Sequence, residues 1–179
     1  MSAGKSKILL EAKELEALYA RLASEIKERE VSSRPYYLVG IHTRGIPIAR
    51  RLAKLLGRNP EEIGTLDINL YRDDLSQASE MPVVKETKLP FAIDGSQILL
   101  VDDVLYTGRT IRAALDALTD LGRPQTIALL VLIDRGEREL PIQPDFCGKK
   151  VSVQPQENVK VRLVETDGID RIEVIDRQT

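Results

Sequence analysis

Short apolar runs alternate with amphipathic helical segments through the middle of the chain, and this alternation constrains the fold more than any other feature. The runs lie within residues 36–41, 97–101 and 126–133. None of them alternates with polar residues, as expected of strands that are buried on both faces. Apolar residues at helical spacing follow the first two runs, within 46–57 and 111–121. The pattern predicts an α/β fold with a mostly parallel central sheet flanked by helices.

Outside this alternation, three patterns predict further elements. Residues 11–29 carry apolar side chains at helical spacing with charged residues between them, which predicts an amphipathic helix. Alternating residues at 65–71 predict a strand. Two short apolar stretches near the end of the chain, at 160–164 and 171–175, predict closing strands.

Two segments lack a periodic pattern. Residues 72–96 are polar and contain Pro82 and Pro90, so we expect a long loop of the kind that often closes over an active site. Residues 134–158 contain three prolines and show little periodicity. We expect irregular structure there.

The string ILLVDDVLYTGRT, residues 98–110, places two adjacent carboxylates, Asp102 and Asp103, at the end of a buried strand. A small turn then leads into a helix at about Thr110. The unpaired N–H groups and the positive dipole end of a helix start suit a phosphate, and the threonine hydroxyls add donors. The upstream carboxylates suit sugar hydroxyls or Mg²⁺ instead. The string therefore predicts a sugar-phosphate site, although a bare pair of strand-end acids is as often only structural.

The whole string closely resembles the phosphoribosyl-pyrophosphate (PRPP) motif of type I phosphoribosyltransferases. Four further strings, VGIHTRG, DINLYRDDLS, LGRP and VLIDRGERELPI, make nearly the whole chain similar to the PyrR family of pyrimidine operon regulators. The resemblance implies a single domain over residues 1–179 with the type I phosphoribosyltransferase fold. It also implies a flexible loop at about 72–96 and a small hood at about 134–158.

The resemblance assigns roles to two loops and to the acidic pair. Residues 43–45 match the pyrophosphate loop, and residues 107–110 match the 5′-phosphate loop. Asp102 and Asp103 match the ribose-binding acids, and Asp103 and Arg72 are the expected catalytic residues. The implied PRPP- and nucleotide-binding residues are Thr43, Arg44, Gly45, Asp102, Asp103, Val104, Leu105, Tyr106, Thr107, Gly108, Arg109 and Thr110.

The resemblance also implies a base site and an RNA site. The string LIDRG, residues 132–136, matches the hood that receives the uracil ring, and its expected contacts are Ile133, Asp134 and Arg135. In the family, the first helix and the hood bind RNA. The expected RNA-binding residues here are Arg21, Arg138 and Lys149.

The implied reaction joins uracil to C1 of PRPP and releases pyrophosphate, which makes UMP. Its transition state resembles an oxocarbenium ion and needs no protein nucleophile. The implied cofactor is Mg²⁺, bound mainly through PRPP and by Asp102 and Asp103 where they reach it. The chain has one histidine, His42, and one cysteine, Cys147, which excludes a Cys–His zinc site. We expect His42 near phosphate and Cys147 as a packed apolar side chain.

Composition limits the expected partners and location. The net charge of −2 indicates no general attraction to nucleic acid or membrane, although residues 31–60 carry six basic residues and no acid. No run approaches the roughly 18 apolar residues of a membrane span. A single cysteine and no visible signal peptide predict a cytoplasmic protein. The expected partners are PRPP, uracil, UMP or UTP, and pyrimidine operon leader RNA, and the resemblance implies a homodimer or a dimer-based oligomer.

Several alternatives stay open at this stage. Ser24, Glu137 and Gln143 depart from the family's RNA-binding pattern, so the chain could be an enzyme that has weakened or lost RNA binding. A purine phosphoribosyltransferase would share the PRPP loop but need a different hood. Arg44 and Arg72 could also be solvated surface charges, and Asp134 and Arg135 could form a local ion pair without a ligand.

Overall fold

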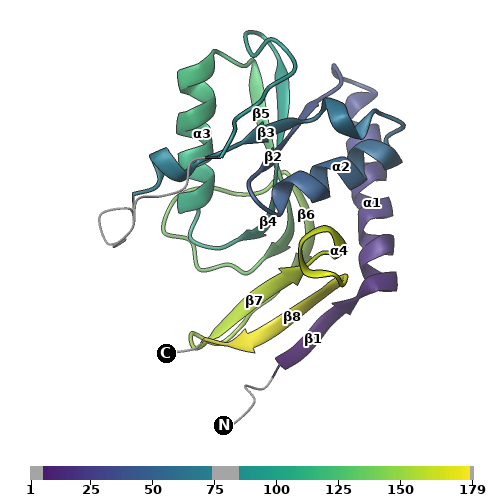
Figure 1. Ribbon diagram of the computed structural model, residues 1–179, viewed down its shortest axis with the longest axis vertical. Coiled ribbons are helices and arrows are strands. Elements are labelled where there is room, and N and C mark those ends of the chain that lie inside the picture. Colours follow the sequence, from purple (N-terminus) through teal and green to yellow (C-terminus); the bar gives the residue numbers. More distant parts are fainter. Residues whose placement is uncertain (1–5, 74–84, 178–179) are drawn as a thin grey trace.

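The structure, a computed structural model, describes residues 6–73 and 85–177. In this part of the chain, a parallel five-stranded sheet has the order β3-β2-β4-β5-β6, and an antiparallel three-stranded sheet has the order β1-β8-β7 (Figure 1). The large sheet consists of β2 (Tyr37–Ile41), β3 (Gly64–Leu66), β4 (Gln97–Leu105), β5 (Thr126–Asp134) and β6 (Phe146–Lys150). The small sheet consists of β1 (Ser6–Glu11), β7 (Glu157–Arg162) and β8 (Arg171–Asp176).

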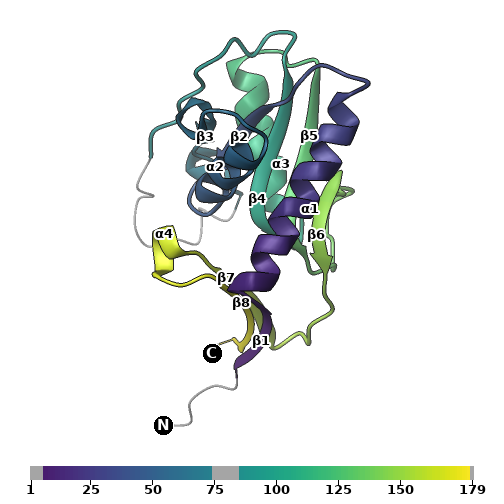
Figure 2. The same cartoon turned by 90° about the vertical axis from the view of Figure 1, so that its right-hand side faces the viewer.

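Helices cover both faces of the large sheet, as the sequence predicts (Figure 2). One face packs against α1 and α2, and the other packs against α3. The helices and helical turns are α1 (Ala12–Glu30), α2 (Gly45–Leu55), η1 (Pro60–Glu62), η2 (Asn69–Tyr71), α3 (Arg109–Leu121) and α4 (Val164–Asp167).

Strand β4 explains the continuous apolar run at the centre of the chain. Leu99 and Val101 point into the cluster under α1 and α2, whereas Ile98 and Leu100 point into the cluster under α3. All four side chains are fully buried. Successive side chains of a strand point to opposite faces, so a strand covered on both faces needs apolar residues at every position.

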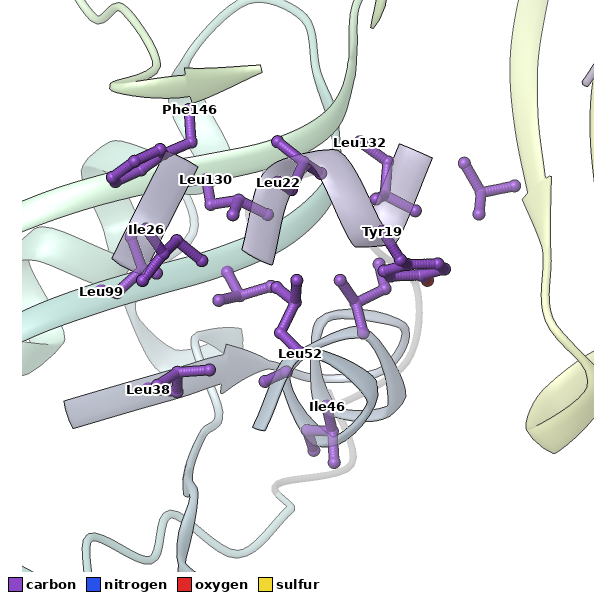
Figure 3. Close-up of a cluster of buried hydrophobic side chains, with 14 of the residues drawn as sticks. Tyr19, Leu22, Ile26, Leu38, Ile46, Leu52, Leu99, Leu130, Leu132 and Phe146 are labelled. Carbon is purple, nitrogen blue, oxygen red and sulfur yellow. The ribbon is translucent and has the colours of Figure 1, made fainter. Parts of the chain in front are cut away.

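The helix expected at 11–29 is confirmed as α1. Its buried side chains, which include Tyr19, Leu22 and Ile26, face the large sheet and α2 (Figure 3). Glu11 and Glu14 form a reciprocal pair of hydrogen bonds at the first turn, so the helix begins at Ala12. Strand β1, directly before it, was not predicted, because a short edge strand with mostly exposed side chains has little apolar pattern.

The strand expected at 65–71 is shorter than predicted. Strand β3 ends at Leu66, and the 3-10 turn η2 follows. The buried Asp67 side chain accepts a hydrogen bond from the Asn69 amide at 3.0 Å, which closes the turn instead of continuing the strand. Within the long loop expected at 72–96, residues 74–84 lie outside the described residues.

The hood differs from its predicted position at 134–158. The small sheet comes from both ends of the described chain, because β1 pairs with β8, and β8 pairs with β7. Most of 134–158 instead leads to β6, which pairs in parallel with β5 and buries Phe146. Apolar periodicity was too short to reveal β6, since only the first of its five residues is buried. No helix among the described residues is long and apolar enough to cross a membrane.

Candidate active site

The site lies at the carboxyl ends of β2 and β4, where an open parallel sheet commonly binds its ligand. The two strands pair only as far as Gly40 and Val101, so β4 continues beyond its neighbour from Asp102 onward. The turn from β2 into α2 packs directly on β4, because a Cβ atom on Gly45 would collide with the Val101 carbonyl oxygen. Glycine at position 45 therefore allows the predicted pyrophosphate loop to lie beside the acidic pair.

Asp102 and Asp103 lie within β4, not at its end as the sequence predicted, since the strand continues to Leu105. The Asp102 side chain is buried and accepts a hydrogen bond from the Asp103 amide at 2.9 Å. Burial and the neighbouring Asp103 raise the pKa of Asp102 well above its usual range. Burial also raises the pKa of Asp103, although the Val104 amide and the positive charge of Arg44 oppose this rise. Burial thus disfavours the charged form of both carboxyls, and a bound cation or sugar hydroxyls would stabilise it.

The predicted 5′-phosphate loop follows β4 and begins α3. Gly108 precedes the helix with a φ of 93°, a left-handed conformation that favours glycine. The helix begins at Arg109, one residue before the predicted start, and the Thr107 hydroxyl accepts a hydrogen bond from the Arg109 amide at 3.3 Å. No acidic residue lies in the first turn of α3. The loop therefore leads directly into a helix start, a feature that suits an anion.

Two carboxylates neutralise Arg109 at this loop. Its guanidinium contacts Asp73 Oδ2 at 2.6 Å and Glu139 Oε2 at 2.5 Å. Arg72 and Asp73 line a cavity of about 160 Å³ together with Thr107, Arg109 and Thr110. The structure thus places Arg72, one of the two expected catalytic residues, beside the 5′-phosphate loop.

The predicted pyrophosphate loop, residues 43–45, contains Thr43 and Arg44. Arg44 Nη2 donates a hydrogen bond to Asp167 Oδ1 of α4 at 2.8 Å. Burial would raise the pKa of Asp167, but hydrogen bonds from Thr166 and Arg44 outweigh it and hold this pKa below its usual range. Sequence reasoning missed Asp167, because nothing in its local pattern links it to a loop that is 123 residues away.

The residues predicted to receive uracil lie at the end of β5, with different surroundings for each. Ile133 is fully buried in the hydrophobic core, so its side chain packs there. Asp134 binds Arg138 at 2.8 Å. Burial would raise the pKa of Asp134, but hydrogen bonds from Arg138 and from the Gly136 amide hold it below its usual range. The Arg135 guanidinium is buried and lies 3.8 Å from the centre of the Tyr106 ring in the 5′-phosphate loop.

The three predicted RNA-binding residues have different surroundings. Arg21 of α1 donates hydrogen bonds to the carbonyl oxygens of Cys147 and Gly148 on β6, and Lys149 is the next residue of that strand and is exposed. Arg138 differs, because its guanidinium binds Asp134 and the backbone oxygens of Tyr106, Gly136 and Ile142. Arg138 thus contacts Asp134, one of the residues expected at the base site.

His42 and Cys147, to which the sequence assigned no catalytic role, also have defined surroundings. His42 Nε2 lies 3.1 Å from the Glu86 carbonyl oxygen, next to the pyrophosphate loop. Cys147 is half-buried on β6, and burial raises the pKa of its thiol. Among the described residues, no group of three or more His, Cys, Asp or Glu side chains could hold a metal ion.

Comparisons with known proteins agree with this geometry. Residues 5–165 match the model of the phosphoribosyl transferase domain. The chain is 54% identical to the bifunctional protein PyrR of Deinococcus deserti, over 98% of this chain and 97% of the relative. It is 52% identical to the bifunctional protein PyrR of Thermus thermophilus, over 95% of this chain and 96% of the relative.

A solved structure shares the fold at much lower identity. A hypoxanthine phosphoribosyltransferase from Staphylococcus aureus superposes with a TM-score of 0.69 at 20% identity, covering 95% of this chain and 92% of that one. This likeness confirms the predicted phosphoribosyltransferase fold. From the domain match and the two close relatives, we conclude that the chain belongs to the phosphoribosyl transferase domain family and, within it, to the PyrR family of bifunctional proteins.

Proposed function

We propose that the protein is a uracil phosphoribosyltransferase that makes UMP and pyrophosphate from uracil and PRPP. The observation that carries this proposal is the neighbouring pair Asp102–Asp103, of which Asp102 is buried, together with one loop that begins a helix and a second loop that holds Arg44. This arrangement supports a substrate with a phosphate at one end, a pyrophosphate at the other and sugar hydroxyls between them.

The chain's own residues would act mainly by orientation and by charge. A bond forms between a uracil nitrogen and C1 of the ribose while the bond from C1 to the pyrophosphate oxygen breaks. Asp102 and Asp103 orient the ribose hydroxyls and lower the energy of positive charge that develops on the sugar ring. The helix start at Arg109 holds the 5′-phosphate, and Arg44 with the loop amides binds the departing pyrophosphate. Arg72 stays a proposed catalytic residue.

The residues also fit the Mg²⁺ that PRPP would bring. Magnesium prefers oxygen ligands and commonly takes one or two protein carboxylates plus substrate phosphates. Asp102 and Asp103 supply two neighbouring carboxylates whose burial disfavours their charged form, so a nearby cation would stabilise them. When bound with PRPP, the ion offsets negative charge on the leaving pyrophosphate.

Parallel assays with three candidate bases test the enzymatic proposal. The protein is incubated with PRPP, Mg²⁺ and either uracil, hypoxanthine or guanine, and release of pyrophosphate is measured. We expect release with uracil only. Release with hypoxanthine or guanine instead would identify a purine phosphoribosyltransferase and overturn the uracil assignment.

We also propose that the protein regulates pyrimidine operon attenuation by binding leader RNA in response to UMP or UTP. Family membership supports this, and Arg21 on α1 and the exposed Lys149 on β6 are the residues that we expect to contact the RNA. Phosphate contacts by such residues would make the affinity fall with salt, with a slope of roughly −0.7 per neutralised phosphate for single strands. We infer a cytoplasmic location for this activity from its ligands, UMP and UTP, and from its partner, the leader RNA. A dimer-based assembly would double the RNA surface.

Gel-shift titrations with and without UMP test the regulatory proposal. We expect UMP to tighten binding of a pyrimidine-operon leader stem-loop, and Lys149→Gln to weaken it. Arg123→Gln is the matched control, because Arg123 is exposed before β5, at the other end of that strand from the site. Absence of a UMP-dependent shift at micromolar protein in low salt would leave an enzyme without the regulatory role.

A further inference from the structure

Lys85 contacts the pyrophosphate loop from a part of the chain that the motifs do not include. Its ammonium donates a hydrogen bond to the Thr43 hydroxyl at 2.7 Å. Its backbone amide donates a hydrogen bond at 2.6 Å to Oδ2 of Asp67, a buried carboxylate directly after β3. One end of Lys85 is therefore fixed to the sheet, while the other end reaches the loop.

The residues that follow Lys85 are anchored to the same region. The His42 ring lies 3.1 Å from the Glu86 carbonyl oxygen, and the Thr87 hydroxyl accepts a hydrogen bond from the Asp67 amide at 3.0 Å. Lys88 and Thr65 exchange two backbone hydrogen bonds, at 2.8 and 2.9 Å. The direction of the Lys85 side chain thus follows from contacts with β3 and with the pyrophosphate loop itself.

Charge distinguishes Lys85 from the other cation at this loop. Arg44 is paired with Asp167, and its charge also acts on Asp103. Within residues 6–73 and 85–177, Lys85 forms no ion pair with a carboxylate, and its one described side-chain partner is a neutral hydroxyl. An ammonium carries three donors, so two of them stay available for an anion at Thr43.

We propose that Lys85 is a further catalytic residue, whose ammonium binds the pyrophosphate group of PRPP beside Thr43. This inference rests on the proposed phosphoribosyl transfer. Negative charge on the pyrophosphate grows as its bond to C1 breaks, so a fixed ammonium binds it more strongly in the transition state than in the bound substrate. UMP carries no pyrophosphate, and its binding does not involve Lys85.

Steady-state kinetics of Lys85→Met against Lys88→Met test the proposal. The two lysines lie three positions apart and are both exposed, but Lys88 contacts β3 only through its backbone. We expect Lys85→Met to lower kcat/KM for PRPP roughly tenfold or more, as the loss of a hydrogen bond to a charged group predicts. Lys88→Met should keep the wild-type value.

The reverse reaction and calorimetry separate this role from a structural one. With UMP and pyrophosphate as substrates, Lys85→Met should raise KM for pyrophosphate, while the dissociation constant for UMP stays within about twofold of the wild type. Lys85→Arg keeps the positive charge and should recover part of the activity. Equal losses of UMP and pyrophosphate affinity, or wild-type kcat/KM in Lys85→Met, would overturn the proposal.

Failure of the broader proposal would look different. If the wild-type chain turned over no nucleobase with PRPP, direct titration with PRPP would still compare the Lys85→Met and wild-type proteins. Weaker PRPP binding in the variant with unchanged UMP binding would then support Lys85 alone. Equal PRPP binding by both proteins would overturn the inference about Lys85 without bearing on uracil.

Discussion

The two anion loops of the site are built in opposite ways. The 5′-phosphate loop, residues 107–110, begins α3 with its own glycine and its own threonine, although distant carboxylates pair with Arg109. The pyrophosphate loop, residues 43–45, instead takes the partners of its side chains from distant segments, since Arg44 binds Asp167 and Thr43 binds Lys85. The turn of the first loop therefore follows from its local sequence, whereas the side chains of the second depend on tertiary packing.

This difference predicts how each loop responds to substitution. A local loop keeps its shape as long as its own residues are kept, because its geometry follows from the strand before it and the helix after it. A loop held by distant side chains loses binding when a residue outside its own segment changes. The acidic pair lies between the loops and should affect substrates at both ends.

The largest effect is expected at the acidic pair. Asp103→Asn removes a charge that is needed most when positive charge develops on the ribose, so we expect kcat to fall by well over tenfold. The fold should survive, because Asp103 does not belong to either apolar cluster of the core. Rates with PRPP and uracil, together with a melting curve, measure both effects. Turnover near the wild-type value would exclude Asp103 from the chemistry.

A smaller effect is expected when a distant anchor of the pyrophosphate loop is removed. Asp167→Asn weakens the pair with Arg44, so kcat/KM for PRPP should fall about fivefold, in the range of a partly buried ion pair. UMP binding should stay unchanged, because the 5′-phosphate loop makes no contact with Asp167 among the described residues. Glu165→Gln, which removes one of the two carboxylates paired with Arg51 on α2, is the control. Equal effects of both variants on kcat/KM would mean that α4 acts only as a packing element.

The same contrast explains how much of the site could be predicted from the sequence. Asp102, Asp103 and the 5′-phosphate loop form one continuous string, whose strand, turn and helix start are visible as a local pattern. Lys85 and Asp167 carry no such signal, because their contacts span 42 and 123 positions and depend on how the chain packs. The hydrogen bond from Arg138 to the Tyr106 carbonyl oxygen, which spans 32 positions, could not be predicted for the same reason.

The fold followed the same rule. Buried central strands and α1 were predicted because every residue, or every residue on one face, is apolar. The two closing strands expected at 160–164 and 171–175 correspond to β7 and β8, whereas their pairing with β1 joins opposite ends of the described chain and was not predicted. The strand expected at 65–71 was too long, because the Asp67 carboxylate accepts hydrogen bonds from the backbone amides of Asn69 and Lys85.

The pH dependence of thermal stability tests the acidic pair in a second way. Burial raises the pKa of Asp102 in the folded protein above the value of about 3.9 in an unfolded chain. A raised pKa contributes stability that is fully present below the unfolded value and is lost as pH rises through the folded value. Asp102→Asn cannot ionise, so it should melt a few degrees above the wild type at pH 8 and gain little at pH 4.

Thermal unfolding at the two pH values measures this gain, and activity should be lost in the same variant. Glu16→Gln on the exposed side of α1 is the control for removing a carboxylate. A gain that is as large at pH 4 as at pH 8 would mean that packing, not ionisation, stabilises the variant.

The smallest effect is expected at the 5′-phosphate loop, where Asp73 forms an ion pair with Arg109 and a longer one, at 3.4 Å, with Arg112. Asp73→Asn removes one carboxylate from each guanidinium, while Glu139 still pairs with Arg109 and Asp116 with Arg112. The loop then presents more positive charge to the phosphate of UMP, so we expect UMP to bind about two- to threefold more tightly at low salt, as exposed ion pairs contribute little. The gain should vanish at about 1 M salt, where the screening length is only about 3 Å. Asp116→Asn is the matched control, because Asp116 pairs with Arg112 but not with Arg109. Weaker UMP binding by Asp73→Asn, measured by calorimetry, would mean that Asp73 positions Arg109 for the phosphate, and that even this loop depends on a residue outside its own segment.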